Sequence, residues 1–153
     1  MVRVQEGDFD LSTEVKKMTD GRTDIGAVVS FTGLVRDFHT SPENAEPDQG
    51  QMTLEHYPGM TEKQLEQIEA EAHKRWPLSD SLIIHRYGTL TPGDQIVMVL
   101  TASPHRQAAF EAAMFLMDWL KTKAPFWKKE TGPQGTNWVA AKSADDAAAD
   151  KWS

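Results

Sequence analysis

The sequence predicts an α+β fold, in which strands and helices alternate irregularly and two short strands lie near the end of the chain. Segments with helical periodicity separate segments rich in β-branched residues, and neither an internal repeat nor a linker divides the chain. A length of 153 residues fits one domain with a sizeable core. We therefore expect a single domain over residues 1–153.

Six segments rich in β-branched and aromatic residues predict strands. They are residues 26–36, 52–57, 81–87, 95–102, 127–131 and 137–141. The first is expected to bend or bulge at Gly33, and the almost entirely apolar run at 95–102 indicates a central strand. Residues 88–90 are expected to form a short extension of the strand before them. Residues 37–51 are polar and contain two prolines, which predicts a long mobile loop.

Four segments predict helices, and they are residues 10–18, 61–76, 103–123 and 143–152. The start signals are Asp10 or Ser12 in the first, a capping box that begins at Thr61 in the second, and Ser103 followed by Pro104 in the third. In the third helix the apolar spacing predicts a stripe that faces the core. The stripe consists of Phe110, Met114, Met117 and Leu120.

The composition excludes several classes of function. A net charge of −7 argues against non-specific binding to nucleic acid or to an anionic membrane, because both need a positive face. The chain has no cysteine, which excludes disulfides, thiolate metal sites and cysteine nucleophiles. Its five histidines show no metal-ligand spacing, so we expect neither a metal nor a cofactor. Neither a signal peptide nor a membrane-length apolar run is visible, and we expect a cytoplasmic protein.

A basic segment stands out in this acidic chain. Residues 121–130 (KTKAPFWKKE) carry four lysines and one glutamate, so the segment has a net charge of +3 and the remaining residues total −10. Such a segment favours a small anionic ligand over a polyanion. The alternative is that Lys121 and Lys123 only complement the dipole at the end of a helix.

Cations also occur at two other positions that suit an anion. His105 and Arg106 lie in the first turn of the predicted third helix, where free backbone N–H groups favour phosphate or carboxylate, although pairing with Glu111 would also explain them. Arg36 follows the first predicted strand and precedes the polar loop, which suits a phosphate contact or a solvated strand end.

Aromatic residues lie between the lysines of the basic segment. Phe126 and Trp127, followed by Lys128 and Lys129, could stack against a flat heterocycle or a base. The alternative is a strand with one buried aromatic side chain. If the chain is an enzyme, lysine is the best candidate for proton transfer, because burial beside other cations lowers its pKa.

Several blocks of the sequence resemble the large, catalytic subunit of molybdopterin synthase. They cover most of the chain in the order and spacing of that family, and LEHYPGM together with KAPFWKKE is the most specific combination. The blocks are GAVVSFTGLVRDF (26–38), LEHYPGM (54–60), IHRYGTLTPGD (84–94), SPHRQAAFEA (103–112) and LKTKAPFWKKE (120–130).

The resemblance implies a fold of the α/β-hammerhead type with a small antiparallel β subdomain. It also implies a homodimer in which each protomer takes up a ubiquitin-like small subunit, giving a heterotetramer. The small subunit ends in a Gly-Gly thiocarboxylate, whose sulfur converts cyclic pyranopterin monophosphate to molybdopterin. A chain without cysteine suits this scheme, since the sulfur must then come from a separate carrier.

The same resemblance implies roles for individual residues. Lys121 and Lys128 match the catalytic lysines, as general acids or bases that also stabilise charge while the pyran ring opens and a thioester forms. Part of the pocket is expected to come from the second protomer. The implied substrate contacts are Leu34, Val35, Arg36, His105, Arg106, Lys121, Lys128, Lys129 and Glu130. The implied contacts to the pocket or to the small subunit's tail are Phe31, Met114 and Phe126.

One position departs from the family pattern, because Leu34 stands where many members have lysine. A substrate contact there is therefore expected only from the backbone or from packing. Two other functions remain open at this point: a non-catalytic module that binds an anion or a pterin on the same fold, and a single-stranded nucleic-acid binder.

Overall fold

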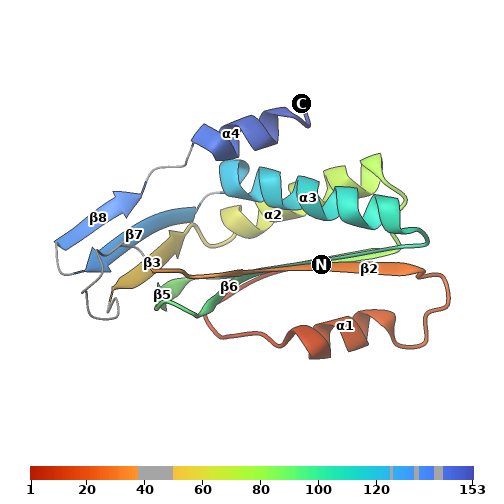
Figure 1. Cartoon of the computed structure of the whole chain (residues 1–153), viewed down its shortest axis with the longest axis horizontal. Coiled ribbons are helices and arrows are strands. Elements are labelled where there is room, and N and C mark those ends of the chain that lie inside the picture. The colour runs from red at the N-terminus through yellow and green to blue at the C-terminus, as the bar shows by residue number, and fades with distance from the viewer. Residues whose placement is uncertain (38–49, 125, 133–134, 140–142) are drawn as a thin grey trace, which may run out of the picture.

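The computed structural model describes residues 1–37, 50–124, 126–132, 135–139 and 143–153, and the side chains of residues 127–144 lie outside this description. Most of the predicted 37–51 loop is also outside the described residues. The strands are β1 (Val2–Gln5), β2 (Ala27–Leu34), β3 (Gln51–His56), β4 (Asp80–Arg86), β5 (Gly88–Leu90), β6 (Gln95–Ser103), β7 (Phe126–Gly132) and β8 (Gly135–Val139). The helices are α1 (Leu11–Thr19), α2 (Met60–Arg75), α3 (Arg106–Lys123) and α4 (Ser143–Asp150). The predicted α+β class is confirmed (Figure 1).

The first sheet, sheet A, has the strand order β1-β4-β6-β2. β1 runs parallel to β4, and the other neighbours are antiparallel. The interior place of β6 confirms the predicted central strand. The register of β2 shifts between Gly33 and Leu34, which confirms the expected irregularity. A Cβ at Gly33 would lie 2.7 Å from the Val97 side chain, so glycine lets the two strands approach closely there.

The second sheet, sheet B, is antiparallel with the order β5-β3-β7-β8. The expectation that residues 88–90 extend the preceding strand is wrong, because β5 pairs with β3 in the other sheet. Gly88, with φ of 92°, turns the chain between the two sheets. The predicted pair of strands near the end of the chain is confirmed as the β7–β8 hairpin.

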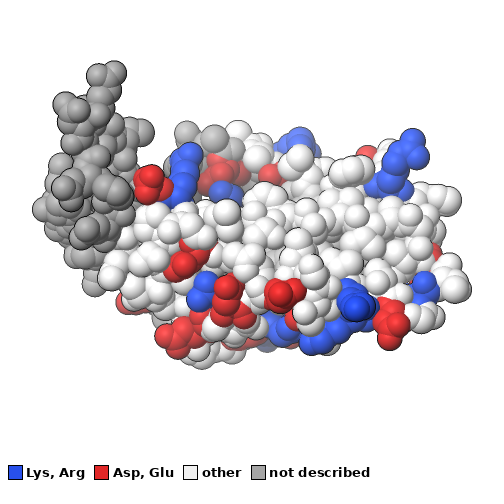
Figure 2. All heavy atoms as spheres, turned by 60° about the horizontal axis from the view of Figure 1, so that its bottom comes forward, with Lys and Arg blue, Asp and Glu red and all other residues white. Residues whose placement is uncertain are grey.

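Helices cover both faces of sheet A, with α2 and α3 on one side and α1 on the other (Figure 1). Alternate residues of β4 and β6 point to opposite faces and meet different partners. On the side of α3, the α3 face, the core includes Ile83, Val97, Val99, Leu65, Phe115 and Leu116. On the side of α1, the α1 face, it includes Leu82, Ile84, Met98, Leu100, Phe9 and Met18. Figure 2 turns the α1 side toward the viewer and shows acidic and basic side chains beside one another there.

The start of α3 differs from the prediction. The N-cap is His105, and the hydroxyl of Ser103 instead donates a hydrogen bond to the carbonyl oxygen of Pro77. The predicted stripe is also partly wrong, since Phe110 and Met114 are 61% and 54% exposed. In the first half of α3, the side of the helix that packs on sheet A carries small side chains instead, and these let the helix lie close to the sheet. The buried residues of α3 include Ala108, Ala109, Ala112 and Ala113, with Phe115, Leu116, Met117 and Leu120.

The starts of α1 and α2 are set by carboxylates. Asp10 caps α1, because its carboxylate accepts a hydrogen bond of 2.9 Å from the backbone N–H of Thr13. The capping box predicted at Thr61 is wrong, since Thr61 lies inside the helix and is fully buried. The carboxylate of Glu62 accepts the N–H of Gly59 at 2.5 Å and fixes the first turn of α2. Within the described ranges, no helix is long and apolar enough to cross a membrane.

Candidate functional site

Two predicted site residues, Arg36 and Lys121, lie at the same end of the α3 face. β2 and β4 run in the same direction, so Arg36, which follows β2, lies at the edge of sheet A where β4 also ends. Lys121 is in the last turn of α3, and Phe126 beyond it stacks on His85 near the end of β4. We call this region, defined by Arg36, Lys121 and Phe126, the lysine end.

A tight turn holds Arg36 in place at the lysine end. The backbone N–H of Val35 donates to the carbonyl oxygen of Asp94 at 2.8 Å. The N–H of Gly93 donates to the carbonyl oxygen of Val35 at 2.6 Å. The side chain of Val35 is 3% exposed and packs in the core, whereas Leu34 is 57% exposed. Arg36 therefore leaves a fixed strand end as an exposed side chain. Val35 serves here as an anchor, with both backbone groups bonded to the turn.

The two lysines in the last turn of α3 differ in their surroundings. The ammonium nitrogen of Lys123 lies 4.4 Å from the centre of the Trp119 ring, a cation–π contact. Lys121 is exposed and forms no ion pair with any residue that the structure describes. Both could complement the helix dipole, but Lys123 has a partner in its own helix. Lys121 is thus the better placed of the two to meet a ligand.

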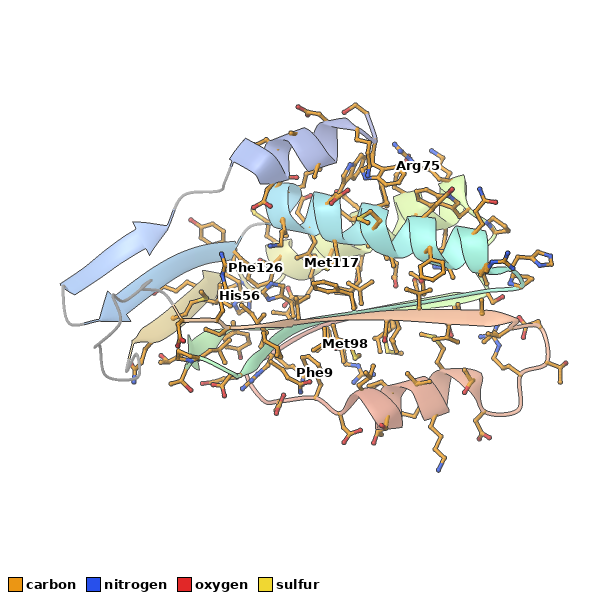
Figure 3. All side chains as sticks on the ribbon, in the orientation of Figure 1. Phe9, His56, Arg75, Met98, Met117 and Phe126 are labelled. Atoms are coloured by element: carbon orange, nitrogen blue, oxygen red, sulfur yellow. The ribbon has the colours of Figure 1, made fainter. Side chains whose placement is uncertain are left out.

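Phe126 connects the end of α3 to sheet B. Its N–H donates to the carbonyl oxygen of Ala124 at 2.9 Å, and its ring stacks on His85 with centroids 3.7 Å apart. Figure 3 shows Phe126 beside His56, on the side of the sheet that α3 covers. The strand continues to Lys128, Lys129 and Glu130, whose backbones pair with Leu54, Thr53 and Met52 of β3, and whose side chains are outside the described part.

At the opposite end of α3, His105 and Arg106 line an open hollow of about 850 Å³. Gly26 allows β2 to begin directly beside it, because a Cβ there would collide with the carbonyl oxygen of Pro104. The first turn of α3 contains no acidic residue, so free N–H groups and the side chains of His105 and Arg106 face the same space. The hollow is lined by Gly26, Pro104, His105, Arg106, Gln107, Phe110 and Glu111.

The sequence left open whether Arg106 forms an ion pair with Glu111, and the structure shows that Glu111 has other partners. Its carboxylate accepts hydrogen bonds from the Gln107 amide at 3.1 Å and from the Trp76 indole N–H at 2.8 Å. These two donors, Gln107 first, lower the pKa of Glu111. Among the described residues, neither His105 nor Arg106 forms an ion pair. This leaves the N–H groups of both side chains available to an anion.

The arginines divide into two groups. The chain has six, and four of them form ion pairs with carboxylates. The four are Arg3, Arg22, Arg75 and Arg86. Arg36 and Arg106 form none with the residues described, and these are the two that the sequence analysis assigned to an anionic ligand.

The predicted site residues do not all meet within one chain. Arg106 and Lys121 are separated by fifteen residues of α3, or about 22 Å at 1.5 Å per residue. Phe31 and Met114, 40% and 54% exposed, lie between the two ends, on β2 and α3. The structure therefore brings Arg36, Lys121 and Phe126 to one end and leaves His105 and Arg106 at the other. No described group of three or more histidines and carboxylates could hold a metal ion.

The sequence analysis missed the histidines at the lysine end. His85 is buried and follows Ile83 by two residues on β4, so both point toward α3. Strand alternation was therefore the signal that could have placed His85 on the α3 face. His56 has no comparable signal, because its surroundings come from the pairing of β3 with β7.

Residues 4–123 match the family model described as MoaE protein. The chain belongs to the MoaE family. A MoaE relative from Rhizobium meliloti (strain 1021), a molybdopterin synthase catalytic subunit, is 54% identical over 99% of this chain and 94% of its own length. The family that the five sequence blocks resembled is thereby confirmed.

Solved MoaE structures share the fold. The molybdopterin biosynthesis MoaE protein from Burkholderia ambifaria MC40-6 superposes with a TM-score of 0.81 at 52% identity, over 99% of this chain and 97% of that chain. Molybdopterin synthase from Staphylococcus aureus gives a TM-score of 0.77 at 31% identity, over 90% and 96% of the two chains. The expected α/β-hammerhead fold came from the resemblance to this family. The chain shares its α+β arrangement with these solved MoaE structures.

Proposed function

We propose that this chain is the catalytic subunit of a molybdopterin synthase, a cytoplasmic sulfurtransferase of molybdenum cofactor biosynthesis built as one domain. The relative from Rhizobium meliloti that bears this name matches 99% of the length of this chain. The observation that carries the proposal is that two exposed cations, Arg36 and Lys121, lie at the same end of the α3 face. Neither forms an ion pair with the residues that the structure describes. These cations suit a substrate that is a phosphate-bearing pterin.

The sulfur comes from a second protein, because a chain without cysteine has no thiol to carry it. We assign that role to the thiocarboxylate at the C-terminus of a ubiquitin-like small subunit. Lys121 and Lys128 act as general acids or bases and stabilise the charge that develops as the pyran ring opens and the thioester forms. Arg36 holds the phosphate, and Lys129 and Glu130 continue the substrate contact along β7.

The second protomer of a homodimer supplies His105 and Arg106. The separation of about 22 Å along α3 keeps them from Lys121 in the same chain, so a shared pocket needs the N-terminal end of α3 from a neighbour. Two small subunits then complete a heterotetramer. Phe31 and Met114, exposed between the two ends of α3, and Phe126 contact the tail of the small subunit or line its path.

A reconstitution tests the function. The chain is mixed with a thiocarboxylated ubiquitin-like partner and cyclic pyranopterin monophosphate, and the dithiolene product is followed by mass spectrometry. We expect product only when all three components are present. Absence of product with the partner bound would contradict catalysis and favour a module that only binds the pterin.

A mixed dimer tests the shared pocket. Protomers with Lys121→Ala and Arg106→Ala are co-expressed with different tags, and the mixed dimer is purified through both. If the pocket crosses the dimer, one of its two sites is intact and about half of the wild-type activity returns. If each pocket lies within one protomer, both sites are damaged and activity stays low. The two homodimeric variants are the controls.

A further inference from the structure

Four rings from four segments of the chain meet where the two sheets adjoin. Phe126 opens β7, His85 is near the end of β4, His56 ends β3, and Tyr87 lies between β4 and β5. The ring centroids are 3.7 Å apart for His85 and Phe126, 4.3 Å for His56 and Tyr87, and 6.2 Å for His56 and Phe126. We call these four side chains the ring cluster; Figure 3 labels its members His56 and Phe126.

His85 presents a fixed surface to Phe126. The side chain is buried, and its ring lies within 18° of parallel to the Phe126 ring. Its Nδ1 is 2.8 Å from the carbonyl oxygen of Arg86. A carbonyl oxygen only accepts hydrogen bonds, so Nδ1 carries a proton and donates it. This bond to the backbone of β4 sets the plane of the imidazole, and the stacked Phe126 ring follows that plane.

His56 holds Phe126 from the side of sheet B. The two residues are directly opposite in the antiparallel register of β3 and β7. Nε2 of His56 lies 3.9 Å from the carboxylate of Glu62, which also accepts the N–H of Gly59 at the start of α2. Phe126 therefore has ring neighbours in both sheets, and His56 in turn lies beside Glu62 in the first turn of α2.

Phe126 lies between the two lysines to which the proposed function gives the chemistry. Lys121 precedes it by five residues and Lys128 follows it by two. The chain turns tightly between them, as the hydrogen bond of 2.9 Å from the Phe126 N–H to the Ala124 carbonyl shows. The direction in which β7 leaves α3 thus depends on where the Phe126 ring sits.

We propose that His85 and His56 are positioning residues, which hold Phe126 and thereby set the placement of Lys121 and Lys128 for sulfur transfer. This inference rests on the proposed function. Small displacements of catalytic groups, on the order of 1 Å, cost about 100-fold in rate, so loosening the ring cluster acts on kcat. A ring cluster that only joins the two sheets would instead act on stability alone.

The experiment separates these two roles in the reconstituted complex. His85→Asn keeps an amide N–H for the Arg86 carbonyl and removes the imidazole ring, and Phe126→Leu removes the other ring. Met98→Ala is the matched control, because Met98 is fully buried on the α1 face, away from the ring cluster. All are assayed below their unfolding temperatures.

We expect His85→Asn and Phe126→Leu to lower kcat by about 10-fold or more, with KM for the pterin within about 2-fold of wild type. Met98→Ala retains kcat despite lower stability. An unchanged kcat in His85→Asn, with an active wild type, would overturn the positioning role and leave the proposed function standing.

A second measurement does not depend on activity. Hydrogen exchange of the backbone amides is compared in the wild type and in His85→Asn. Faster exchange in β7 with unchanged exchange in the centre of β6 supports the positioning role. Equal exchange in β7 would overturn it, even if the wild type made no product and the proposed function failed.

Discussion

Three cations near the ends of α3 differ from the ion pair that is buried on the α1 face. On the α1 face, the Arg3 guanidinium donates two hydrogen bonds to the Glu14 carboxylate, at 2.9 and 2.6 Å, and Asp10 caps the helix. Around α3, by contrast, Arg36, Arg106 and Lys121 form no ion pair with the residues described. The paired charges of the α1 face hold the fold together, whereas the unpaired cations of the α3 face are free to bind a ligand.

Removal of the Lys121 side chain should have the largest effect on product formation, and it tests this contrast. We expect Lys121→Ala to lower formation of the dithiolene product by at least about 100-fold, because a group that transfers protons contributes 10²–10⁴-fold. Its stability and its binding of the small subunit should not change, since Lys121 is exposed. Lys123→Ala is the matched control in the same helical turn, and turnover is followed by mass spectrometry. Equal losses in both variants would show that only the helix end matters.

Glu14→Gln should give the opposite result, a loss of stability without a loss of turnover. Glu14 is 7% exposed, and Arg3 is about a third exposed, so we expect a loss of about 2 kcal/mol, below the range for fully buried pairs. Urea unfolding at pH 7 measures the change. A loss of turnover at unchanged stability would break the contrast between the faces.

The same variant should change the response to acid. The hydrogen bonds from Arg3 hold the pKa of Glu14 below its ordinary value of 4.5. The stabilisation is therefore complete above pH 4.5 and is lost as the pH falls through the lowered value. The difference in unfolding free energy between wild type and Glu14→Gln should shrink on acidification from pH 7 to about pH 3. A difference that stays constant would mean that the pair does not stabilise the fold.

Arg36→Ala and Arg106→Ala should each weaken pterin binding by about 10-fold, the magnitude of one charge-assisted hydrogen bond. Their unfolding free energies should stay within about 0.5 kcal/mol of wild type, as is usual for exposed side chains. Calorimetric titration with the pterin and with the small subunit gives the two affinities separately. Equal weakening of both affinities would assign these arginines to the structure of the complex.

Asp10→Ala should have the smallest effect, a loss of about 1 kcal/mol from the missing N-cap of α1. Turnover should be unchanged, because the cap lies on the α1 face. Thermal unfolding measures the loss, and Asp10→Asn, which can still accept the N–H of Thr13, is the control. A variant as stable as wild type would show that the cap is dispensable.

Periodicity in the sequence predicted most elements but not which face of α3 is buried. The helix has an alanine-rich face and a second apolar face with Phe110 and Met114, and size alone favoured the larger side chains. The close approach of α3 to sheet A reverses that choice in the first half of the helix, where four alanines are buried against the strands. Of the four positions that the prediction placed in the core, Phe110 and Met114 are 61% and 54% exposed, whereas Met117 and Leu120 are buried.

The candidate site was predicted residue by residue, but not its division in space. Arg36 and Arg106 were predicted from their places at a strand end and a helix start, because such signals are local in sequence. That they lie at opposite ends of α3 follows from the direction of β2 and from the length of the helix. The stacking of His85 on Phe126 depends on residues 41 positions apart, which no local pattern contains.

The pairing of β3 with β7 also bears on how the protein is made. Partner residues in these strands, from His56 and Phe126 to Gln51 and Thr131, are 70 to 80 positions apart. A ribosome that adds 5–20 residues per second needs roughly 4–16 s to synthesise that interval. During this time β4, β5 and β6 are made, so all four strands of sheet A, as well as β5 of sheet B, precede β7 in synthesis. The strand that carries Lys128 can therefore pair with β3 only after every strand of sheet A has been made.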